Sequence, residues 1–291
     1  MPRPTRLAGA ALRGLAAVGG LVVLANATLM LALFGPGEGA ARLASDWRRI
    51  AVAHQLSENR VTIQAAFATT YGEDLRPEAG ADAIRSHLAA DLEAGEPALL
   101  DVILVRHILA RFGAIDGRTV PPGVYLAAGP IGPDRWPGPL LTHYLIFPRH
   151  GYLLVVPHRQ GDRWPEAYEA TASLRGAFHR SGDENTLHGV VETYRPGAYD
   201  FPTPGEPLHD LVLLTRDPEE TAKIAEGLGA FTRRLDESHL AYRLLRRNSN
   251  SALACYLAGA GLTEDVRRRL GSRLLLRLRL PGIVHTQSLP C

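Results

Sequence analysis

The sequence of 291 residues predicts an α+β protein, and two observations predict this class. Between about residues 121 and 215 the chain is rich in proline, glycine and aromatic residues, and its apolar runs are short, as in strands separated by turns. Before and after that region, alanine and leucine dominate and apolar residues recur three and four apart, which is typical of amphipathic helices. We therefore expect a sheet packed on helices.

The chain begins with an uncharged apolar segment, Gly14–Phe34, which is long enough to span a bilayer as a helix. Arginines precede it, and basic flanks stay in the cytoplasm. Residues 1–37 are therefore expected to form a tail and a single-pass transmembrane anchor in the cell (inner) membrane. The N-terminus would be cytoplasmic and the main domain outside the cytoplasm. The alternative is a cleaved signal peptide, with Ala25-Asn26-Ala27 as the cleavage pattern.

Residues 38–116 are expected to be a helical juxtamembrane segment, and residues 117–291 to form the main domain. A turn centred on residues 149 and 150 predicts a hairpin over 142–157, whereas residues 160–208 resemble a loop region because they are polar and rich in proline. The predicted strands are Val124–Ala128, Leu141–Phe147, Tyr152–Val156 and Leu211–Thr215.

Two late helices have recognisable starts. Asp217 at the cap position, followed by Pro218 and two acidic residues, predicts a helix that ends near Arg234. The second start, residues 248–251, has the sequence Asn-Ser-Asn-Ser, four residues that all favour caps where one would suffice.

The predicted hairpin places His143 and His158 on one face, near one end of the sheet, because side chains alternate along a strand. Two imidazoles in this position can form a site. They can equally be strand-end histidines whose hydrogen bonds are satisfied by solvent or backbone.

A strand-end histidine, followed much later by Tyr242 and by an Asn-Ser pair that opens a helix, resembles the circularly permuted papain-like superfamily. That superfamily includes relatives of lecithin:retinol acyltransferase. The Asn-Ser-Asn-Ser run most resembles a bacterial membrane-associated subgroup of unknown function. The resemblance covers about residues 121–263 and implies that residues 117–291 form a small antiparallel sheet packed on helices.

The resemblance also implies roles for individual residues. Ser249 occupies the position of the nucleophilic cysteine, His143 that of the base, and His158 is a candidate for the residue that orients the base. Supporting roles at the site fall to Tyr242, Asn248, Asn250 and Ser251. A serine hydroxyl ionises far less readily than a thiol, so Ser249 does not form the resting ion pair with histidine that a cysteine does.

Three functions follow, and the sequence leaves open whether the chain is an enzyme. The first is a catalytically silent papain-like domain (a pseudoenzyme) that binds a cell-envelope component, such as peptidoglycan peptide or a lipid-like ligand. The second is a hydrolase or acyltransferase acting on an amide or ester, with Ser249 as nucleophile and His143 as base. The third is a structural membrane protein without a pocket.

Composition and motifs indicate which classes of molecule the chain is expected to bind. The net charge is +2, and no glycine-rich phosphate loop, zinc motif or base-reading motif is present, so no metal, cofactor or nucleic acid is expected. The two cysteines, Cys255 and Cys291, cannot form a disulfide framework, although a single bridge is open to them. Membrane lipid is an expected partner, because six arginines lie among leucines over residues 267–280.

Overall fold

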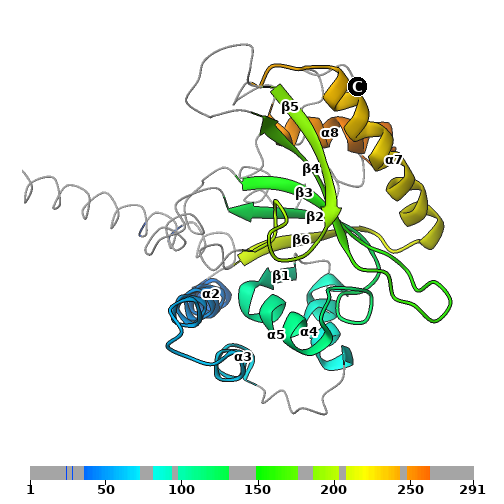
Figure 1. Ribbon diagram of the computed structural model, residues 1–291. Helices are drawn as coiled ribbons and strands as arrows, with labels where there is room; N and C mark the ends of the chain where they lie inside the picture. The colour runs from blue at the N-terminus through cyan, green and yellow to red at the C-terminus, as the bar shows by residue number, and fades with distance from the viewer. Residues whose placement is uncertain are drawn as a thin grey trace, which may run out of the picture.

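The computed structural model describes residues 24, 28, 36–72, 81–93, 98–130, 149–175, 186–202, 208–242 and 248–262. Within these ranges the chain forms one six-stranded antiparallel sheet with helices on both faces (Figure 1). The predicted α+β class is confirmed.

The strands lie in the order β1-β6-β2-β3-β4-β5, and every neighbouring pair is antiparallel. In this register Gly129 is opposite His150, and Glu169 is opposite Glu192. The strands are β1 (Ala98–Asp101), β2 (Gly123–Pro130), β3 (Arg149–Val156), β4 (Tyr168–Arg175), β5 (Thr186–Thr193) and β6 (Leu208–Thr215).

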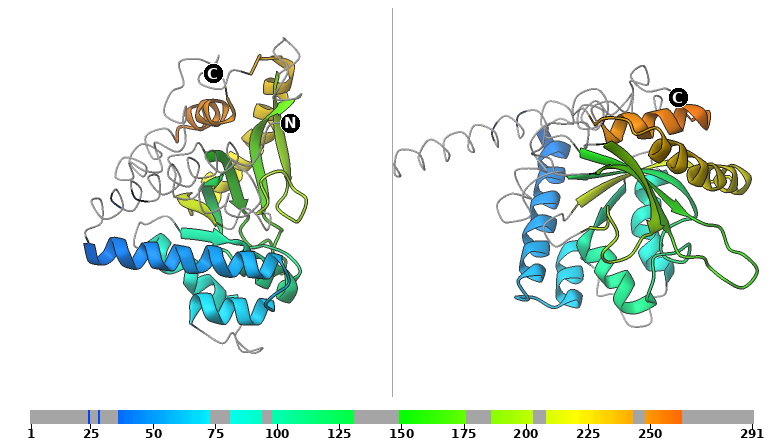
Figure 2. Two further views of the ribbon diagram at one scale, coloured as in Figure 1. Left: turned by 90° about the vertical axis from the view of Figure 1, so that its left-hand side faces the viewer. Right: turned by 45° about the horizontal axis from the view of Figure 1, so that its top comes forward.

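Two helical layers cover the sheet, one on each face (Figure 2). The first layer contains α2 (Pro36–Ser57), α3 (Ile63–Tyr71), α4 (Ala81–Glu93) and α5 (Val102–Phe112); the second contains α7 (Pro218–Glu237) and α8 (Ser249–Gly259). Tyr125 and Leu154 belong to the core of the first layer, whereas Leu126 and Val155 belong to the core under α7 and α8. Because both faces are covered, the central strands are continuous apolar runs without polar alternation.

Side-chain caps fix where the helices begin. Asp217 accepts a hydrogen bond from the N–H of Glu220 at 2.8 Å, so α7 begins as predicted and continues to Glu237. Asp101 ends β1 and caps α5 by accepting from the N–H of Leu104 at 2.7 Å. The hydroxyl of Tyr71 donates to the same carboxylate at 2.5 Å, which ties α3 to the sheet.

The predicted hairpin over residues 142–157 is wrong at its turn. Arg149 and His150, expected at the turn, are the first two residues of β3 and pair with β2. Residues 142–148 lie outside the described residues. The Pro-Arg-His-Gly sequence favours a turn locally, but long-range pairing with Gly129 and Pro130 extends the strand past this signal.

Two coarser expectations are also corrected. The predicted loop region 160–208 contains β4 and β5, whose polar residues suit the outer part of the sheet. The predicted helical segment 38–116 contains β1, which pairs with β6. The partner of β1 is more than 100 residues away in sequence, and the prolines around β4 and β5 hide their strand pattern, so local composition did not reveal these strands.

No helix in the described parts of the chain is long and apolar enough to cross a membrane. The predicted anchor Gly14–Phe34 lies outside the described residues except for Leu24 and Thr28. The arginine-rich segment 267–280 also lies outside them.

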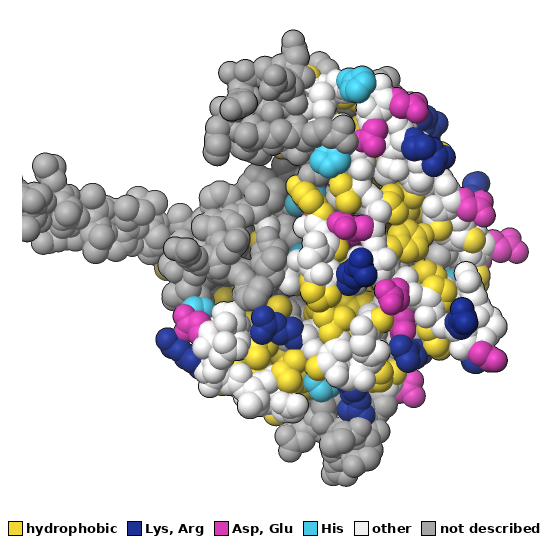
Figure 3. Space-filling view, viewed as in Figure 1, with side chains coloured by type: hydrophobic (Ala, Val, Ile, Leu, Met, Phe, Trp, Pro, Cys, Tyr) yellow, Lys and Arg dark blue, Asp and Glu magenta, His cyan; other side chains and the backbone are white. Residues whose placement is uncertain are grey.

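The described surface carries charges of both signs. On the face shown in Figure 3, Lys and Arg side chains are interspersed with Asp and Glu. The large exposed apolar side chains include Trp47, Val191 and Tyr199. Tyr199 is 55% exposed, although the next residue, Asp200, is buried.

The contact between α7 and the edge strand β5 gives a direct test of this packing. A Cβ added at Gly189 would lie 2.6 Å from the Cα of Thr232 in α7, too close for a side chain. We expect Gly189→Ala to lower the free energy of unfolding by about 1–3 kcal/mol, as overpacking does. Chemical denaturation monitored by circular dichroism measures this change.

Gly227, in the same helix, is the matched control. A Cβ there would lie 3.4 Å from the hydroxyl of Tyr256, an ordinary contact. Gly227→Ala should therefore raise the free energy of unfolding by up to about 1 kcal/mol, through helix propensity. Equal effects of the two substitutions would contradict the close α7–β5 packing.

Candidate functional site

The N-terminus of α8 lies against the first residues of β3. Ser249 is the first residue of α8, and its Oγ lies 3.0 Å from Nδ1 of His150. The other ring nitrogen, Nε2, lies 2.8 Å from Oγ1 of Thr171 on the neighbouring strand β4. A helix start and two adjacent strands therefore align a serine, a histidine and a threonine.

The hydrogen bonds of Thr171 determine which ring nitrogen of His150 carries the proton. The Thr171 hydroxyl donates to the carbonyl of Gly151 at 3.2 Å, so it accepts from His150. In this arrangement Nε2 carries the hydrogen and the lone pair lies on Nδ1. That lone pair faces the Ser249 hydroxyl, in the arrangement that a general base requires.

A carboxylate completes the surroundings of the ring. Oδ2 of Asp200, in the loop after β5, lies 3.3 Å from Nε2 of His150. The Tyr199 ring packs edge-on against the His150 ring, with centroids 5.6 Å apart. Ser249 and Asp200 are each 8% exposed, so these groups interact away from bulk water.

Buried titratable groups lie behind the site. Burial, followed by the positive charge of Arg149 and by His150, lowers the pKa of His209 to about 3. His209 is therefore neutral at ordinary pH, and its Nδ1 pairs with the hydroxyl of Tyr152 at 3.0 Å. Burial, followed by the nearby charge of Asp200, raises the pKa of Glu169 to about 8.

Arg149, the residue before His150, is fully buried. Its guanidinium forms an ion pair with Asp210 on β6, with Nη1 and Oδ2 2.9 Å apart, and donates to the carbonyl of Ala128 on β2 at 3.1 Å. The start of β3 is thus fixed to two other strands.

Each residue of the Asn-Ser-Asn-Ser run has a separate task. Asn248 caps α8 by accepting from the N–H of Ser251 at 2.9 Å, and Ser251 completes a capping box with the N–H of Asn248. Ser249 faces His150. Asn250 accepts from the N–H of Gly151 at 2.8 Å and donates to the carbonyl of Arg149 at 2.9 Å.

The remaining residues predicted for the site are placed differently. His143 lies outside the described residues, and the histidine that contacts Ser249 is His150, seven positions later. His158 lies two residues beyond Val156, the far end of β3, which is roughly 20 Å from His150 at 3.3 Å per strand residue. Tyr242 is half-buried beyond α7, and burial followed by Tyr199 raises its pKa.

His150, Thr171, Asp200 and Glu169 were missed as site residues by the sequence analysis. His150 was assigned to a turn, and Asp200 lies in a segment that looked like a loop. One signal was present: alternation within Tyr168–Arg175 places Glu169 and Thr171 on one face of a strand. That signal was too short to stand out beside the prolines around it.

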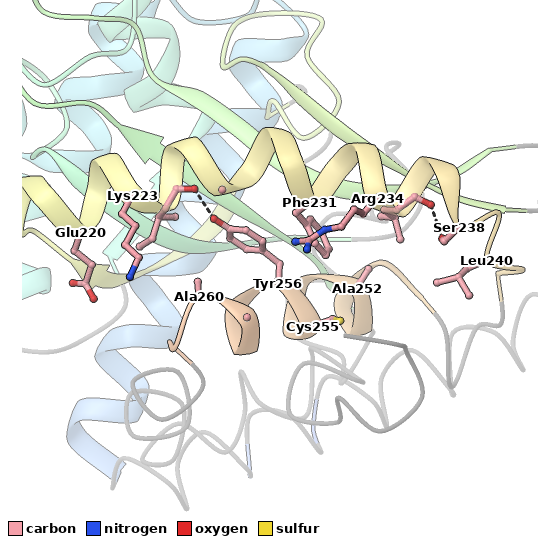
Figure 4. Close-up of a pocket in the computed structure, with 14 residues that line it drawn as sticks. Glu220, Lys223, Phe231, Arg234, Ser238, Leu240, Ala252, Cys255, Tyr256 and Ala260 are labelled. Atoms are coloured by element: carbon pink, nitrogen blue, oxygen red, sulfur yellow. Dashed lines mark hydrogen bonds between the residues drawn. The ribbon is translucent and has the colours of Figure 1, made fainter.

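A cavity of about 390 Å³ lies between α7 and α8 (Figure 4). Its walls include Phe231, Arg234 and Tyr256, but neither Ser249 nor His150. Cys255 also lines it and is disulfide-bonded; Cys291, the chain's one other cysteine, lies outside the described residues. No group of three or more His, Cys, Asp or Glu residues within the described ranges is arranged to hold a metal ion.

The two hydrogen bonds of Asn250 generate a prediction. Asn250→Ala leaves the N–H of Gly151 and the carbonyl of Arg149 without partners, so we expect the free energy of unfolding to fall by about 1–3 kcal/mol. Asn250→Asp should cost more, because a carboxylate oxygen would then face the Arg149 carbonyl. Urea denaturation measures both changes.

Asn59 serves as the control for this pair. It is exposed, with a φ of 55°, a conformation that glycine adopts freely. Asn59→Gly should leave stability almost unchanged. If the Asn250 variants are as stable as the parent, the link between α8 and β3 contributes nothing to the free energy of unfolding.

Comparisons with protein-family models, with curated proteins and with solved structures find no match for this chain. Its function is therefore argued from the geometry of Ser249, His150, Thr171 and Asp200.

Proposed function

We propose that the chain is a hydrolase or acyltransferase that acts on an amide or ester, with Ser249 as nucleophile and His150 as general base. One observation carries the proposal: Ser249 Oγ lies 3.0 Å from the ring nitrogen that the Thr171 contact leaves unprotonated. This replaces His143 with His150 in the second function suggested by the sequence. The proposal includes the resemblance of this domain to the permuted papain-like superfamily.

In the proposed reaction, Oγ of Ser249 attacks the substrate carbonyl carbon while Nδ1 of His150 takes the hydroxyl proton. The proton moves during the attack, because a serine does not ionise beforehand. The imidazolium then gives this proton to the leaving amine or alcohol. The bond between the carbonyl carbon and the leaving group breaks, and the acyl group stays bonded to Oγ of Ser249. A water molecule or an acceptor hydroxyl or amine releases the acyl group by the same steps in reverse.

Thr171 and Asp200 have orienting roles in this scheme. Thr171 accepts from Nε2 of His150 at 2.8 Å and holds the ring in the tautomer that leaves Nδ1 basic, while Oδ2 of Asp200 lies 3.3 Å from the same nitrogen as a neighbouring negative charge. Once His150 gains the proton, the negative charge of Asp200 stabilises the imidazolium. In this scheme Asp200 and Thr171 take the orienting role for which the resemblance suggested His158.

The first turn of α8 can supply oxyanion donors. Ser251 N–H bonds the Asn248 side chain and Ala252 N–H bonds the Asn248 carbonyl. The described residues provide no acceptor for the N–H groups of Ser249 and Asn250. These two donors, at the positive end of a helix, suit the negative oxygen of a tetrahedral intermediate.

The setting of the proposed enzyme follows from the sequence. An anchor at Gly14–Phe34 would hold the domain at the outer side of the inner membrane, where peptidoglycan peptides and lipids offer amides and esters. The disulfide at Cys255 supports an oxidising compartment outside the cytoplasm.

A fluorophosphonate probe, which reacts with activated serines, tests the proposal on the full chain in detergent. We expect labelling of the parent and none of Ser249→Ala. His150→Gln should slow labelling by about 10²–10⁴-fold, the usual contribution of a general base. Asp200→Asn should also slow it, because the imidazolium loses its counter-charge.

The control is Ser57→Ala, which removes a serine bonded to the carbonyl of His54 at the end of α2. It should be labelled as fast as the parent. If the parent and Ser249→Ala are equally unreactive, the enzyme proposal fails. The first function suggested by the sequence, a silent domain that binds an envelope component, would then be preferred.

A further inference from the structure

Two glutamates hold the loop that carries Asp200. Glu169 on β4 and Glu192 on β5 are directly opposite each other in the sheet register. Oε1 of Glu169 accepts from the N–H of Asp200 at 2.8 Å, and Oε1 of Glu192 accepts from the N–H of Tyr199 at 2.6 Å. Two neighbouring carboxyl groups therefore bind two consecutive amides.

The second carboxylate oxygen of Glu169 indicates that Glu169 and Glu192 need a proton between them. Glu169 is fully buried, and its Oε2 has no donor among the described residues. Glu192 is the carboxyl group beside it, and two carboxylates cannot hydrogen-bond unless a proton lies between them. One proton on the pair satisfies Oε2 and removes the repulsion between adjacent like charges.

We propose that Glu169 and Glu192 share one proton and in that state position Asp200 against His150, so that loss of the proton weakens the contact between Asp200 and the ring. Glu169 is a positioning residue here, since it acts through Asp200. Only the effect of this positioning on catalysis rests on the proposed function. The position of Asp200 relative to His150 can be measured without any enzyme activity.

The N–H of Asp200 favours the carboxylate form of Glu169, but burial and the neighbouring acids outweigh it and favour the protonated form. Asp200 faces it from the loop after β5, and Glu192 faces it from β5; both are acids. Tyr152 lies near it on β3, and its own pKa is raised well above the ordinary value by burial and, in part, by Glu169 and Asp200. The residue opposite Glu169 on β3 is Leu154, which is apolar.

The direction of the pH effect follows. Burial, then Asp200 and Glu192, raise the pKa of Glu169 from 4.5 to about 8. Below that pH the pair keeps its proton and the loop is held. As the pH rises through about 8, the proton leaves and three carboxylates repel one another, which favours movement of the Asp200 loop away from His150.

Nuclear magnetic resonance of the His150 ring, in the full chain labelled with ¹³C at histidine Cε1, tests the inference. His150→Gln identifies the signal among the 11 histidines. The parent should show, besides the ring's own titration, a second transition centred near the Glu169 pKa of about 8. Glu169→Gln, a neutral mimic of the protonated acid, should lack that transition and keep the low-pH spectrum.

Two further variants make the test specific. Glu166→Gln changes an exposed glutamate just before β4 and should retain the transition. Glu192→Gln removes a neighbour that raises the Glu169 pKa, so the transition should move to lower pH. If Glu169→Gln folds poorly, Glu192→Gln still tests the inference, because Glu192 is only half-buried.

A parent without the second transition, or a Glu169→Gln protein that keeps it, would overturn the inference. Fluorophosphonate labelling over the same pH range separates it from the proposed function. If the transition occurs without any labelling, the positioning is right and the enzyme proposal is wrong. If labelling depends on Ser249 but the transition is unaffected by Glu169→Gln, the enzyme proposal stands and the positioning is wrong.

Discussion

Asn250 joins the first turn of α8 to the first residues of β3, and the candidate site depends on this joint. Its amide bonds the backbone on both sides of His150, through the carbonyl of Arg149 and the N–H of Gly151. Ser249 is the residue before Asn250 in the helix, so the serine and the imidazole, 99 positions apart in sequence, are placed by one side chain. All four side chains of residues 248–251 are buried, and each forms hydrogen bonds, as buried polar groups must.

A buried ion pair fixes the same strand end from the sheet side. Arg149 is fully buried against Asp210 and the carbonyl of Ala128. Such pairs contribute little net stability compared with apolar residues, but removing one partner leaves a buried charge and is costly. Here the pair joins the start of β3 to β6 through side chains, while the register of β3 against β2 fixes the position of His150, which contacts Ser249 at the start of α8. Asn250 holds the same strand end from the side of α8.

The contacts that hold Asp200 near His150 depend more on conditions than the contacts made by Asn250 and Arg149. Thr171 belongs to a paired strand, whereas Asp200 belongs to a loop held through the amides of residues 199 and 200. Carboxyl groups hold those amides, and their charge depends on pH in a way that the bonds of Asn250 do not. Ser249 and His150 are therefore placed by the neutral hydrogen bonds of Asn250, whereas Asp200, which lies beside the ring, is held by titratable groups.

The sequence by itself determined the local features. The α+β class, the strands at Val124, Tyr152 and Leu211, the Asp217 cap and the capped start of α8 at Asn248 all follow from short-range periodicity and capping chemistry. Ser249 was the candidate nucleophile because the resemblance to the permuted papain-like superfamily aligns it with the cysteine that opens a helix, and the start of that helix follows from local capping residues.

Only the tertiary structure decided which histidine faces Ser249 and which acid supports it. Pro148-Arg149-His150-Gly151 has the local chemistry of a turn, and pairing with Gly129 made it a strand instead. Asp200 lies among prolines that indicate a loop, and its function arises from contacts with Glu169 and His150, on strands distant in sequence. Strand pairing and side-chain contacts between distant segments depend on the whole chain, so no local pattern could reveal them.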